Sequence, residues 1–305
     1  MLQLWRLLLA TKSRPLILTS SRWRDYLALT KPRVISLLLF SAILSSFAAA
    51  GGWPGFTVFI AVLVGGYAAT GAANTINMIW ERDLDLRMER TQSRPVAAHR
   101  ISTNNALIFA ASLLILALLT LGLLTNWLAA AMALAGASTY VVIYTIWLKR
   151  RTWLNIVIGG AAGAFPPLVG WAAVTGNLPP VAWALFGLIF LWTPVHFWSL
   201  ALLLADDYAK AGVPMLPVVR GSRETTRQIF VYALATLAAC PVPFWLGEAG
   251  LVYLITATGL SVYLVWLSWG LHRELTKSRA RGLFHYSMIY LALVFLLLAV
   301  DRSFM

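Results

Sequence analysis

Polar side chains gather in residues 77–95, directly after a long uncharged stretch, although only 11% of the chain is charged. Within this segment Asn77, Glu81 and Asp85 follow one another at intervals of four residues. If the helix expected from the preceding apolar run continues, this spacing places all three polar groups on one face. An amide and two carboxylates in such a column can bind a divalent cation through oxygen.

Arginines are interleaved with these acids and complete the pattern. Arg82, Arg87, Arg90 and Arg94 supply fixed positive charge beside the column. Mg2+ prefers one or two carboxylates together with substrate phosphates to a cage made only of protein ligands, and the guanidinium group is suited to phosphate oxygens. The segment therefore predicts a site for a magnesium-bound diphosphate.

The elements that must position these residues are membrane helices. Apolar residues make up 60% of the chain and the mean hydropathy is +0.77. Apolar runs of roughly twenty residues recur, which is typical of a polytopic helical membrane protein. We expect an all-α bundle of nine spans, with boundaries good to a few residues, at 35–50, 56–79, 105–124, 127–147, 154–175, 181–204, 228–246, 250–270 and 282–301.

The distribution of basic residues orients this bundle. Of the 24 Lys and Arg residues, only Arg302 falls on one side of the expected arrangement, and the loops on that side, at 51–55, 125–126, 176–180 and 247–250, are neutral or acidic. By the positive-inside rule the basic side, with the N-terminus, is cytoplasmic. Basic loops beside an anionic leaflet of the lipid bilayer also account for the net charge of +13, so no nucleic-acid partner is needed to explain it.

The chain divides into two parts. Residues 1–24 contain no acid and several arginines, which is typical of a segment on the membrane surface or of a weak transit peptide. Residues 25–305 form the single transmembrane domain. The one cysteine, Cys240, lies in an apolar segment beside Pro241, where we interpret it as a packing residue.

A second acidic segment follows the sixth expected span. Asp206 and Asp207 are its only acids before Glu224. It occupies a place in the second half of the chain that corresponds to the first acidic segment, which suggests a pseudo-repeat of four spans.

Several segments resemble one family in their order along the chain. The pattern formed by Asn77, Glu81, Asp83, Asp85, Met88, Arg90, Thr91, Arg94 and Pro95 is similar to the signature of the heme O synthases, the protoheme farnesyltransferases of the UbiA superfamily of membrane prenyltransferases. The similarity extends to 29–38, 144–152, 155–176, 192–198, 207–221 and 284–301, and so covers roughly residues 25–301.

The sequence departs from the family pattern at a few positions. Glu81 stands where the family usually has Asp, and the longer side chain keeps its capacity to bind a metal. Val195 replaces the usual Pro before His196. Asp206 adds an acid where a base is common, so only Asp207 and Tyr208 are carried over from the second motif.

The resemblance implies a reaction between farnesyl diphosphate and heme b. The C–O bond of farnesyl diphosphate ionises to an allylic cation and diphosphate, a heme vinyl carbon attacks this cation, and water captures the resulting cation and loses a proton to give heme O. Asn77, Glu81, Asp85 and Asp207 are the implied Mg2+ ligands, and Asp83 joins them as a catalytic residue. The implied contacts to the diphosphate are made by Lys31, Arg33, Arg90, Arg94, Lys149 and Arg150.

The implied heme contacts are His196 and Tyr208. A single histidine near the end of a membrane helix is also a common structural residue that packs and accepts or donates one hydrogen bond. For His196 the alternative to a heme contact is therefore packing beside Trp192 and Trp198.

Two other functions compete with this one. Another UbiA-type enzyme, with a quinone or chlorophyll precursor as acceptor, would share the acidic column but not the residues around it. An ion-coupled transporter would place its acids near the middle of the bilayer, whereas these acids lie at an expected helix end among arginines. We expect the bacterial plasma membrane rather than the mitochondrial inner membrane, with a downstream heme A synthase or an oxidase assembly factor as a further candidate partner.

Overall fold

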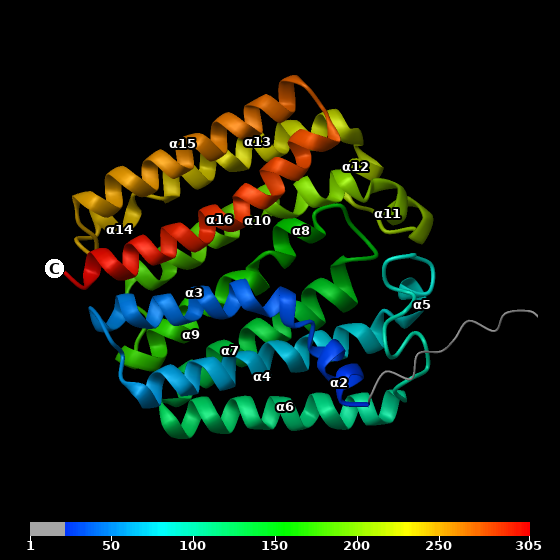
Figure 1. Cartoon of the computed structure of the whole chain (residues 1–305), viewed down its shortest axis with the longest axis horizontal. Coiled ribbons are helices and arrows are strands. Elements are labelled where there is room, and N and C mark those ends of the chain that lie inside the picture. Colours follow the sequence, from blue (N-terminus) through cyan, green and yellow to red (C-terminus); the bar gives the residue numbers. More distant parts are fainter. Residues whose placement is uncertain (1–21) are drawn as a thin grey trace, which may run out of the picture.

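The computed structural model describes residues 22–305, and within them it contains nine helical stretches long and apolar enough to cross a membrane (Figure 1). This confirms the expected all-α bundle. The stretches are Pro32–Ala50, Phe56–Trp80, Thr103–Leu124, Trp127–Leu148, Asn155–Thr175, Pro180–Leu203, Gly221–Trp245, Leu251–Arg273 and Lys277–Arg302.

Six of these stretches are single helices, namely α3 (Pro32–Ala50), α4 (Phe56–Trp80), α6 (Thr103–Leu124), α10 (Pro180–Leu203), α15 (Leu251–Arg273) and α16 (Lys277–Arg302). The other three are composite: α7 (Trp127–Ser138) continues as the π-helical segment η1 (Thr139–Leu148), α8 (Asn155–Gly159) precedes α9 (Ala161–Thr175), and α13 (Gly221–Ala239) precedes α14 (Val242–Trp245). Short helices at the ends are α2 (Arg22–Thr30), α5 (Arg82–Asp85), α11 (Ala205–Ala211) and α12 (Leu216–Val219).

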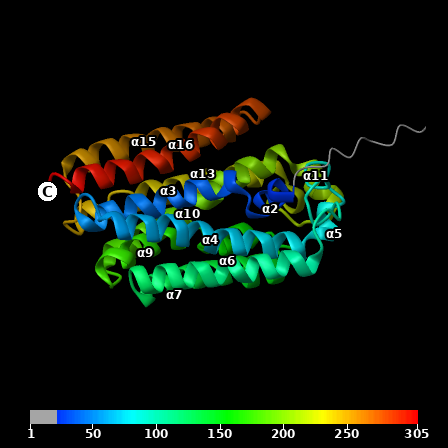
Figure 2. The ribbon, with the colours of Figure 1, turned by 60° about the horizontal axis from the view of Figure 1, so that its bottom comes forward.

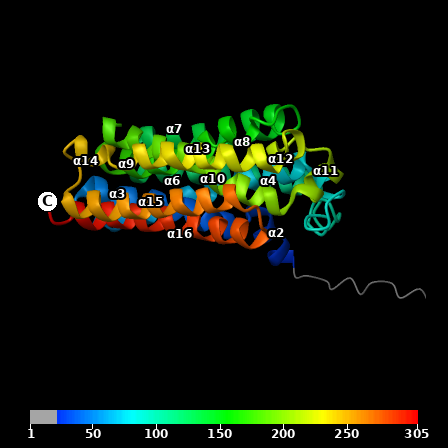
Figure 3. The ribbon, with the colours of Figure 1, turned by 90° about the horizontal axis from the view of Figure 1, so that it is seen from above.

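The helices lie roughly along one long axis, so the molecule has two distinct ends (Figures 1 and 2). Helices α5 and α11 lie together at one end (Figure 2), which we call the α5 end, and α14 and the C-terminus lie at the other, the α14 end (Figure 3). The two acidic segments of the sequence therefore share one end of the bundle, although they are separated by more than one hundred residues. The cytoplasmic placement of this end stays a prediction from the positive-inside rule.

Close helix contacts in the middle of the bundle depend on small residues. Helices α3 and α9 pack tightly, and a Cβ atom at Gly170 of α9 would collide with the carbonyl oxygen of Ala42 in α3. Small residues at such crossings let two backbones approach closely, which is the usual basis of helix packing in membranes. The large apolar side chains then point outward, as Ile108, Ile115 and Leu123 of α6 do.

The N-terminal extension is only partly described, because residues 1–21 lie outside the described part of the chain. Helix α2 packs against α4 and is separated from α3 by Lys31, whose backbone φ of 55° lies in the left-handed region. The chain therefore turns sharply at Lys31, and this turn brings its side chain to the end of α4.

Candidate functional site

The acidic column continues α4 toward the α5 end. Asn77 is in the last turn of α4, the amide of Glu81 donates to the Asn77 carbonyl oxygen at 2.9 Å, and the amide of Asp85 donates to the Glu81 carbonyl oxygen at 2.8 Å. The helical path expected from the four-residue spacing is thus maintained through the column. All three side chains are buried, each with about 2% or less of its surface exposed.

Two cations neutralise the buried carboxylates, one from a distant segment and one from the acidic segment itself. Lys149, just after η1, places its Nζ 2.6 Å from Glu81, and Arg94 places Nη1 2.7 Å from Asp85 Oδ1. Both cations are residues that the sequence assigned to a diphosphate. In this structure they hold the carboxylates that the sequence assigned to a metal, so the two sets of residues form one cluster.

Asn77 has its own polar partners. Lys31 Nζ donates to Asn77 Oδ1 at 2.6 Å, and Asn77 Nδ2 donates to Thr145 Oγ1 at 3.0 Å. Burial, followed by the nearby positive charge of Arg94, lowers the pKa of Lys31 from its usual 10.5 to about 7. A lysine in this setting releases its proton far more readily than one in water.

The two carboxylates retain unused capacity. Glu81 Oε1 and Asp85 Oδ2 are buried and have no hydrogen-bond partner among the described residues. The Lys149 Nζ lies close to both oxygens of Glu81, but it makes a hydrogen bond of proper geometry only with Oε2. A buried carboxylate oxygen without a partner is costly, and here two of them face the same cluster of charges.

These unused oxygens fit a divalent cation. Within residues 22–305 no three His, Cys, Asp or Glu side chains come close enough together to form a metal cage. A magnesium ion does not need one, because two carboxylates, an amide oxygen and phosphate oxygens from a substrate are a suitable ligand set. The donor set in the column matches that requirement.

Asp83 and Arg150 lie apart from the buried column. They form a two-pronged ion pair with distances of 2.7 and 2.9 Å, and Asp83 is about half exposed, at 49%. The hydrogen bond from Arg150 lowers the pKa of Asp83. Arg90 is also exposed. The structure therefore separates these three predicted site residues from Glu81 and Asp85, which lie inside.

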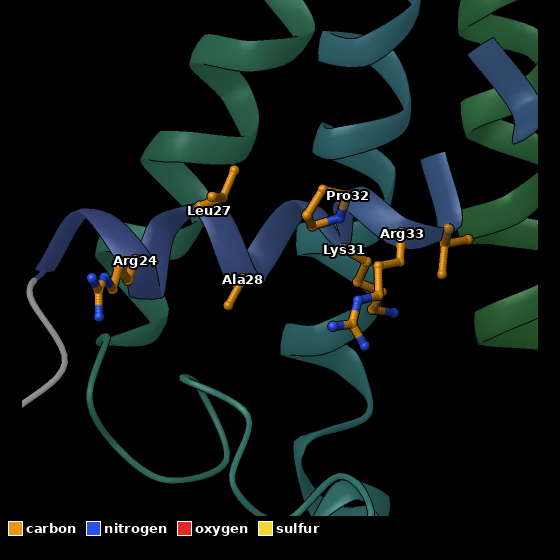
Figure 4. A pocket seen from close by; sticks show the side chains of 7 residues that line it. Arg24, Leu27, Ala28, Lys31, Pro32 and Arg33 are labelled. Atoms are coloured by element: carbon orange, nitrogen blue, oxygen red, sulfur yellow. The ribbon is translucent and has the colours of Figure 1, made fainter. Parts of the chain in front are cut away.

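Arg33 belongs to a different surface from Lys149. It lines an open groove of about 400 Å3 at the α2–α3 junction, together with Arg24 and Lys31. Figure 4 shows these three side chains on the same side of the junction, with Leu27 and Pro32 supplying apolar lining. Lys31 is the residue that connects this groove to the buried column, through its bond to Asn77.

The second acidic motif lies in α11 at the same end. Asp207 is half-buried, Asp206 is exposed, and Tyr208 packs against the core. The Asp207 carboxylate makes no hydrogen bond or ion pair with any other described residue. Asp207 is thus a half-buried carboxylate that is free to bind something else.

His196 is packed in an aromatic stack within α10. Its ring lies parallel to those of Trp192 and Phe284, each with a centroid distance of 4.7 Å, and its Nδ1 is 2.8 Å from Ser287 Oγ. The Ser287 hydroxyl donates to the Phe284 carbonyl oxygen at 2.7 Å, so its oxygen accepts the Nδ1 proton. This arrangement favours the tautomer in which Nδ1 carries the proton and Nε2 does not.

Thr145, Tyr140 and Tyr144 are neighbours of the site that the sequence analysis did not identify. They belong to η1, where Tyr140 and Tyr144 stack on each other and Lys149 lies 5.7 Å from the centre of the Tyr144 ring. π-Helical segments are frequent at functional sites. No sequence signal marks one, although the polar Thr145 four residues before Lys149 repeats the spacing of the acidic column.

Comparisons with known proteins identify relatives over most of the chain. The model of the UbiA prenyltransferase family matches residues 38–297. A protein named protoheme IX farnesyltransferase from Thermus thermophilus is 57% identical over 281 residues, which are 92% of this chain but 46% of that protein. The chain thus spans about half the length of that relative. A protein of the same name from Deinococcus radiodurans is 50% identical and is covered over 94% of its length.

Solved structures show the same fold at low sequence identity. A digeranylgeranylglyceryl phosphate synthase structure aligns with a TM-score of 0.78 and 21% identity, over 94% of this chain and all of the other. A UbiA homolog from Archaeoglobus fulgidus bound to GPP and Mg2+ aligns with a TM-score of 0.67 and 17% identity, over 90% of this chain and 99% of that one.

Proposed function

This chain belongs to the UbiA prenyltransferase family, and we propose that it transfers the farnesyl group of farnesyl diphosphate to a vinyl group of heme b. Addition of water completes the reaction, and the products are heme O and diphosphate. The names of the relatives that are 57% and 50% identical support this choice of substrates. The observation that carries it is the buried column, in which carboxylates with unused oxygens lie beside three cations.

The proposed magnesium ligands are Asn77, Glu81, Asp85 and Asp207. The first three offer Oδ1, Oε1 and Oδ2, and the last offers a half-buried carboxylate from α11 at the same end. Support for a metal also comes from the UbiA homolog of Archaeoglobus fulgidus, which has the same fold and whose structure contains Mg2+. When bound, the ion neutralises the diphosphate and so favours loss of that leaving group.

The cations around the column bind and orient the diphosphate. Lys31, Arg94 and Lys149 are the inner set, because each already contacts a residue of the column. Their hydrogen bonds stabilise negative charge as it develops on the leaving group. Arg33, Arg90 and Arg150 form an outer set on the surface of the same end, where they attract the anionic substrate from a distance. Asp83 holds Arg150 in place through its ion pair.

The proposed heme contacts are His196 and Tyr208. The ring of His196 is fixed on both faces, and the hydrogen bond at Nδ1 leaves Nε2 with its lone pair available. A histidine that binds a metal commonly has its other nitrogen held in this manner. The geometry therefore suits an approach to the heme iron, and packing alone is the alternative.

We place the α5 end on the cytoplasmic side of a bacterial plasma membrane, which follows the positive-inside rule. A downstream heme A synthase or an oxidase assembly factor is a proposed receiver of the product.

One experiment tests the proposal directly. Hemes are extracted from cells expressing the full chain and analysed by mass spectrometry, and an inactive Asp85→Asn variant serves as the control. We expect a heme carrying a hydroxyethylfarnesyl group in the first sample alone. Purified protein should also release diphosphate from farnesyl diphosphate only when heme b is present. Diphosphate release with a quinone precursor and not with heme would show that the prenyl acceptor is the quinone precursor.

A further inference from the structure

We propose that Thr145 is a positioning residue that fixes the side-chain amide of Asn77, so that the Asn77 oxygen faces the metal site. This inference rests on the proposed function, since it concerns a proposed magnesium ligand. Asn77 carries an oxygen and a nitrogen at the end of one side chain, and only the oxygen can bind a cation. Something must therefore select between the two orientations of the amide.

The hydrogen-bond partners of Asn77 favour one orientation. Lys31 in its ammonium form can only donate, and its Nζ lies 2.6 Å from Oδ1. The Thr145 hydroxyl donates its single proton to the carbonyl oxygen of Tyr140 at 2.9 Å. Its oxygen must then accept, and it accepts from Asn77 Nδ2 at 3.0 Å. The chain Tyr140–Thr145–Asn77 thus fixes the direction of every proton.

Burial makes this selection strong. Asn77 has 1% of its surface exposed and Thr145 has none, so water cannot replace a lost partner. Rotating the amide by half a turn would bring Nδ2 against the Lys31 ammonium, and Thr145 could donate to Oδ1 only by giving up its hydrogen bond to the Tyr140 carbonyl oxygen. Buried polar groups that lose their hydrogen-bond partners lower the stability of the arrangement. The inverted amide is therefore disfavoured on both sides.

The π-helical segment brings Thr145 to this place. The Thr145 hydroxyl bonds the carbonyl oxygen five residues earlier, and the Lys149 amide also bonds a carbonyl five residues earlier, that of Tyr144, at 2.9 Å. Thr145 and Lys149 contact Asn77 and Glu81, and both contacts join residues 68 positions apart. Thus η1 runs alongside α4 in the same direction, and the two helical segments contact each other at two successive turns.

The matched contacts have different tasks. Lys149 supplies charge to Glu81, whereas Thr145 is neutral and can affect the metal only through Asn77. A residue that orients a metal ligand commonly changes metal affinity by about 10–100-fold when it is lost. A threonine with a purely structural role would instead affect the stability of the fold and leave metal affinity unchanged.

The test compares Thr145→Val, which removes the hydroxyl at nearly constant shape, with Thr145→Ser, which keeps it. The full chain in detergent receives saturating farnesyl diphosphate and no heme, so that no turnover occurs. Mg2+ is titrated, and the rise in melting temperature gives the midpoint concentration. We expect Thr145→Val to need about tenfold more Mg2+ and Thr145→Ser to stay within about twofold of the original protein. A Thr145→Val curve that overlays the original, or equal shifts in both variants, would overturn the proposal.

Repeating the test in an Asn77→Asp variant makes it specific to the orientation of the Asn77 amide. In Asn77→Asp both side-chain oxygens accept hydrogen bonds and can bind a cation, so no orientation needs to be selected. Adding Thr145→Val to Asn77→Asp should then leave the Mg2+ midpoint unchanged. If the tenfold shift persists in this background, Thr145 does not act through the amide and the proposal fails.

The outcome for the proposed function is read separately. If the original protein responds to Mg2+ but its cells contain no farnesylated heme, the choice of substrate fails, while the difference between valine and serine at position 145 still supports the positioning role. If the original protein shows no response to Mg2+ with farnesyl diphosphate present, the metal site and the positioning role fail together.

Discussion

At the α5 end of the bundle, Glu81 and Asp85 each keep one buried oxygen that accepts no hydrogen bond from the described residues, although Lys149 lies close to that of Glu81, whereas at the α14 end Asp301 uses both of its oxygens. Asp301, near the end of α16, accepts hydrogen bonds from the backbone amides of Gly250 and Tyr253 at the start of α15. It acts as the cap of a neighbouring helix, because the first amides of a helix have no partner within it.

Arg302 completes the cluster at the α14 end. It donates to the carbonyl oxygen of Ala48 at 2.6 Å, forms an ion pair with Glu248, and lies over the ring of Trp171. These contacts join α16 to the C-terminal end of α3 and to the loop before α15. Arg302 is also the one basic residue that the positive-inside pattern leaves on this side, and its contacts give a structural reason for that exception.

Buried charged groups have different roles at the two ends of the bundle: structural at the α14 end and, as we propose, ligand-binding at the α5 end. At the α14 end the charged groups are held by backbone amides and carbonyls and by the Glu248–Arg302 ion pair, so the cluster ties helices together. At the α5 end the charges are held by other side chains, and oxygens remain unused. Spare capacity of this kind lowers stability and is expected where the missing partner is a ligand.

The largest predicted effect follows from removing one charge at the α5 end. Asp85→Asn keeps the shape of the side chain but removes a proposed metal ligand, and Asp207→Asn does the same from α11. We expect the rate of diphosphate release with heme b to fall by at least about 10^2–10^3-fold, the size found when a group that stabilises transition-state charge is lost. Near-normal rates for both variants in a Mg2+-dependent assay would show that Asp85 and Asp207 are not metal ligands. The proposed difference in function between the α5 end and the α14 end would then fail as well.

His196 offers a second test, because it too has one bonded and one free nitrogen. If a nitrogen without a hydrogen-bond partner indicates ligand binding, His196→Ala should weaken heme binding by about tenfold or more, the range expected when a group that holds a metal is disturbed. The affinity for farnesyl diphosphate should stay within about twofold of the original value. Heme is titrated by absorbance and farnesyl diphosphate by calorimetry on the same detergent-solubilised protein. Parallel loss of both affinities, with a lower melting temperature, would show that His196 is a packing residue.

Much of this arrangement could be predicted from the sequence. Hydropathy alone determines the nine spans, and the four-residue spacing determines that Asn77, Glu81 and Asp85 share a helical path. The choice of partners could not be predicted, because Lys149 meets Glu81 across 68 residues and a contact of that range depends on how α4 packs against η1. Helical spacing does agree with the exposed position of Asp83, because a residue two positions from Glu81 and from Asp85 lies on the opposite face of the helix.

A substitution at the α14 end should lower the stability of the protein and leave its activity unchanged. Asp301→Asn leaves one oxygen to accept a backbone amide but turns the other acceptor into a donor that faces an amide. We expect a loss of about 1–3 kcal/mol in the free energy of unfolding, seen as a lower melting temperature, with rate constants of the folded protein unchanged. Glu248→Gln, which leaves the α15 cap intact, is a comparison variant at the same end. A large loss of activity in Asp301→Asn at a temperature where it is fully folded would show that the α14 end takes part in the reaction.

The smallest predicted effect is that of Asp83→Asn, the same substitution as Asp85→Asn made two residues away. Asp83 is about half exposed and its partner Arg150 is 37% exposed, so water screens the ion pair and its contribution to stability is about 0–1 kcal/mol. Because the Asp83 carboxylate is turned away from the buried column, its loss should change the rate of diphosphate release by no more than about threefold, through a less firmly held Arg150. The rate is measured beside that of Asp85→Asn under the same Mg2+ and heme concentrations. A loss in Asp83→Asn as large as that in Asp85→Asn would mean that the surface acid reaches the substrate after all, and that burial in the column does not decide which acids of this segment act in the reaction.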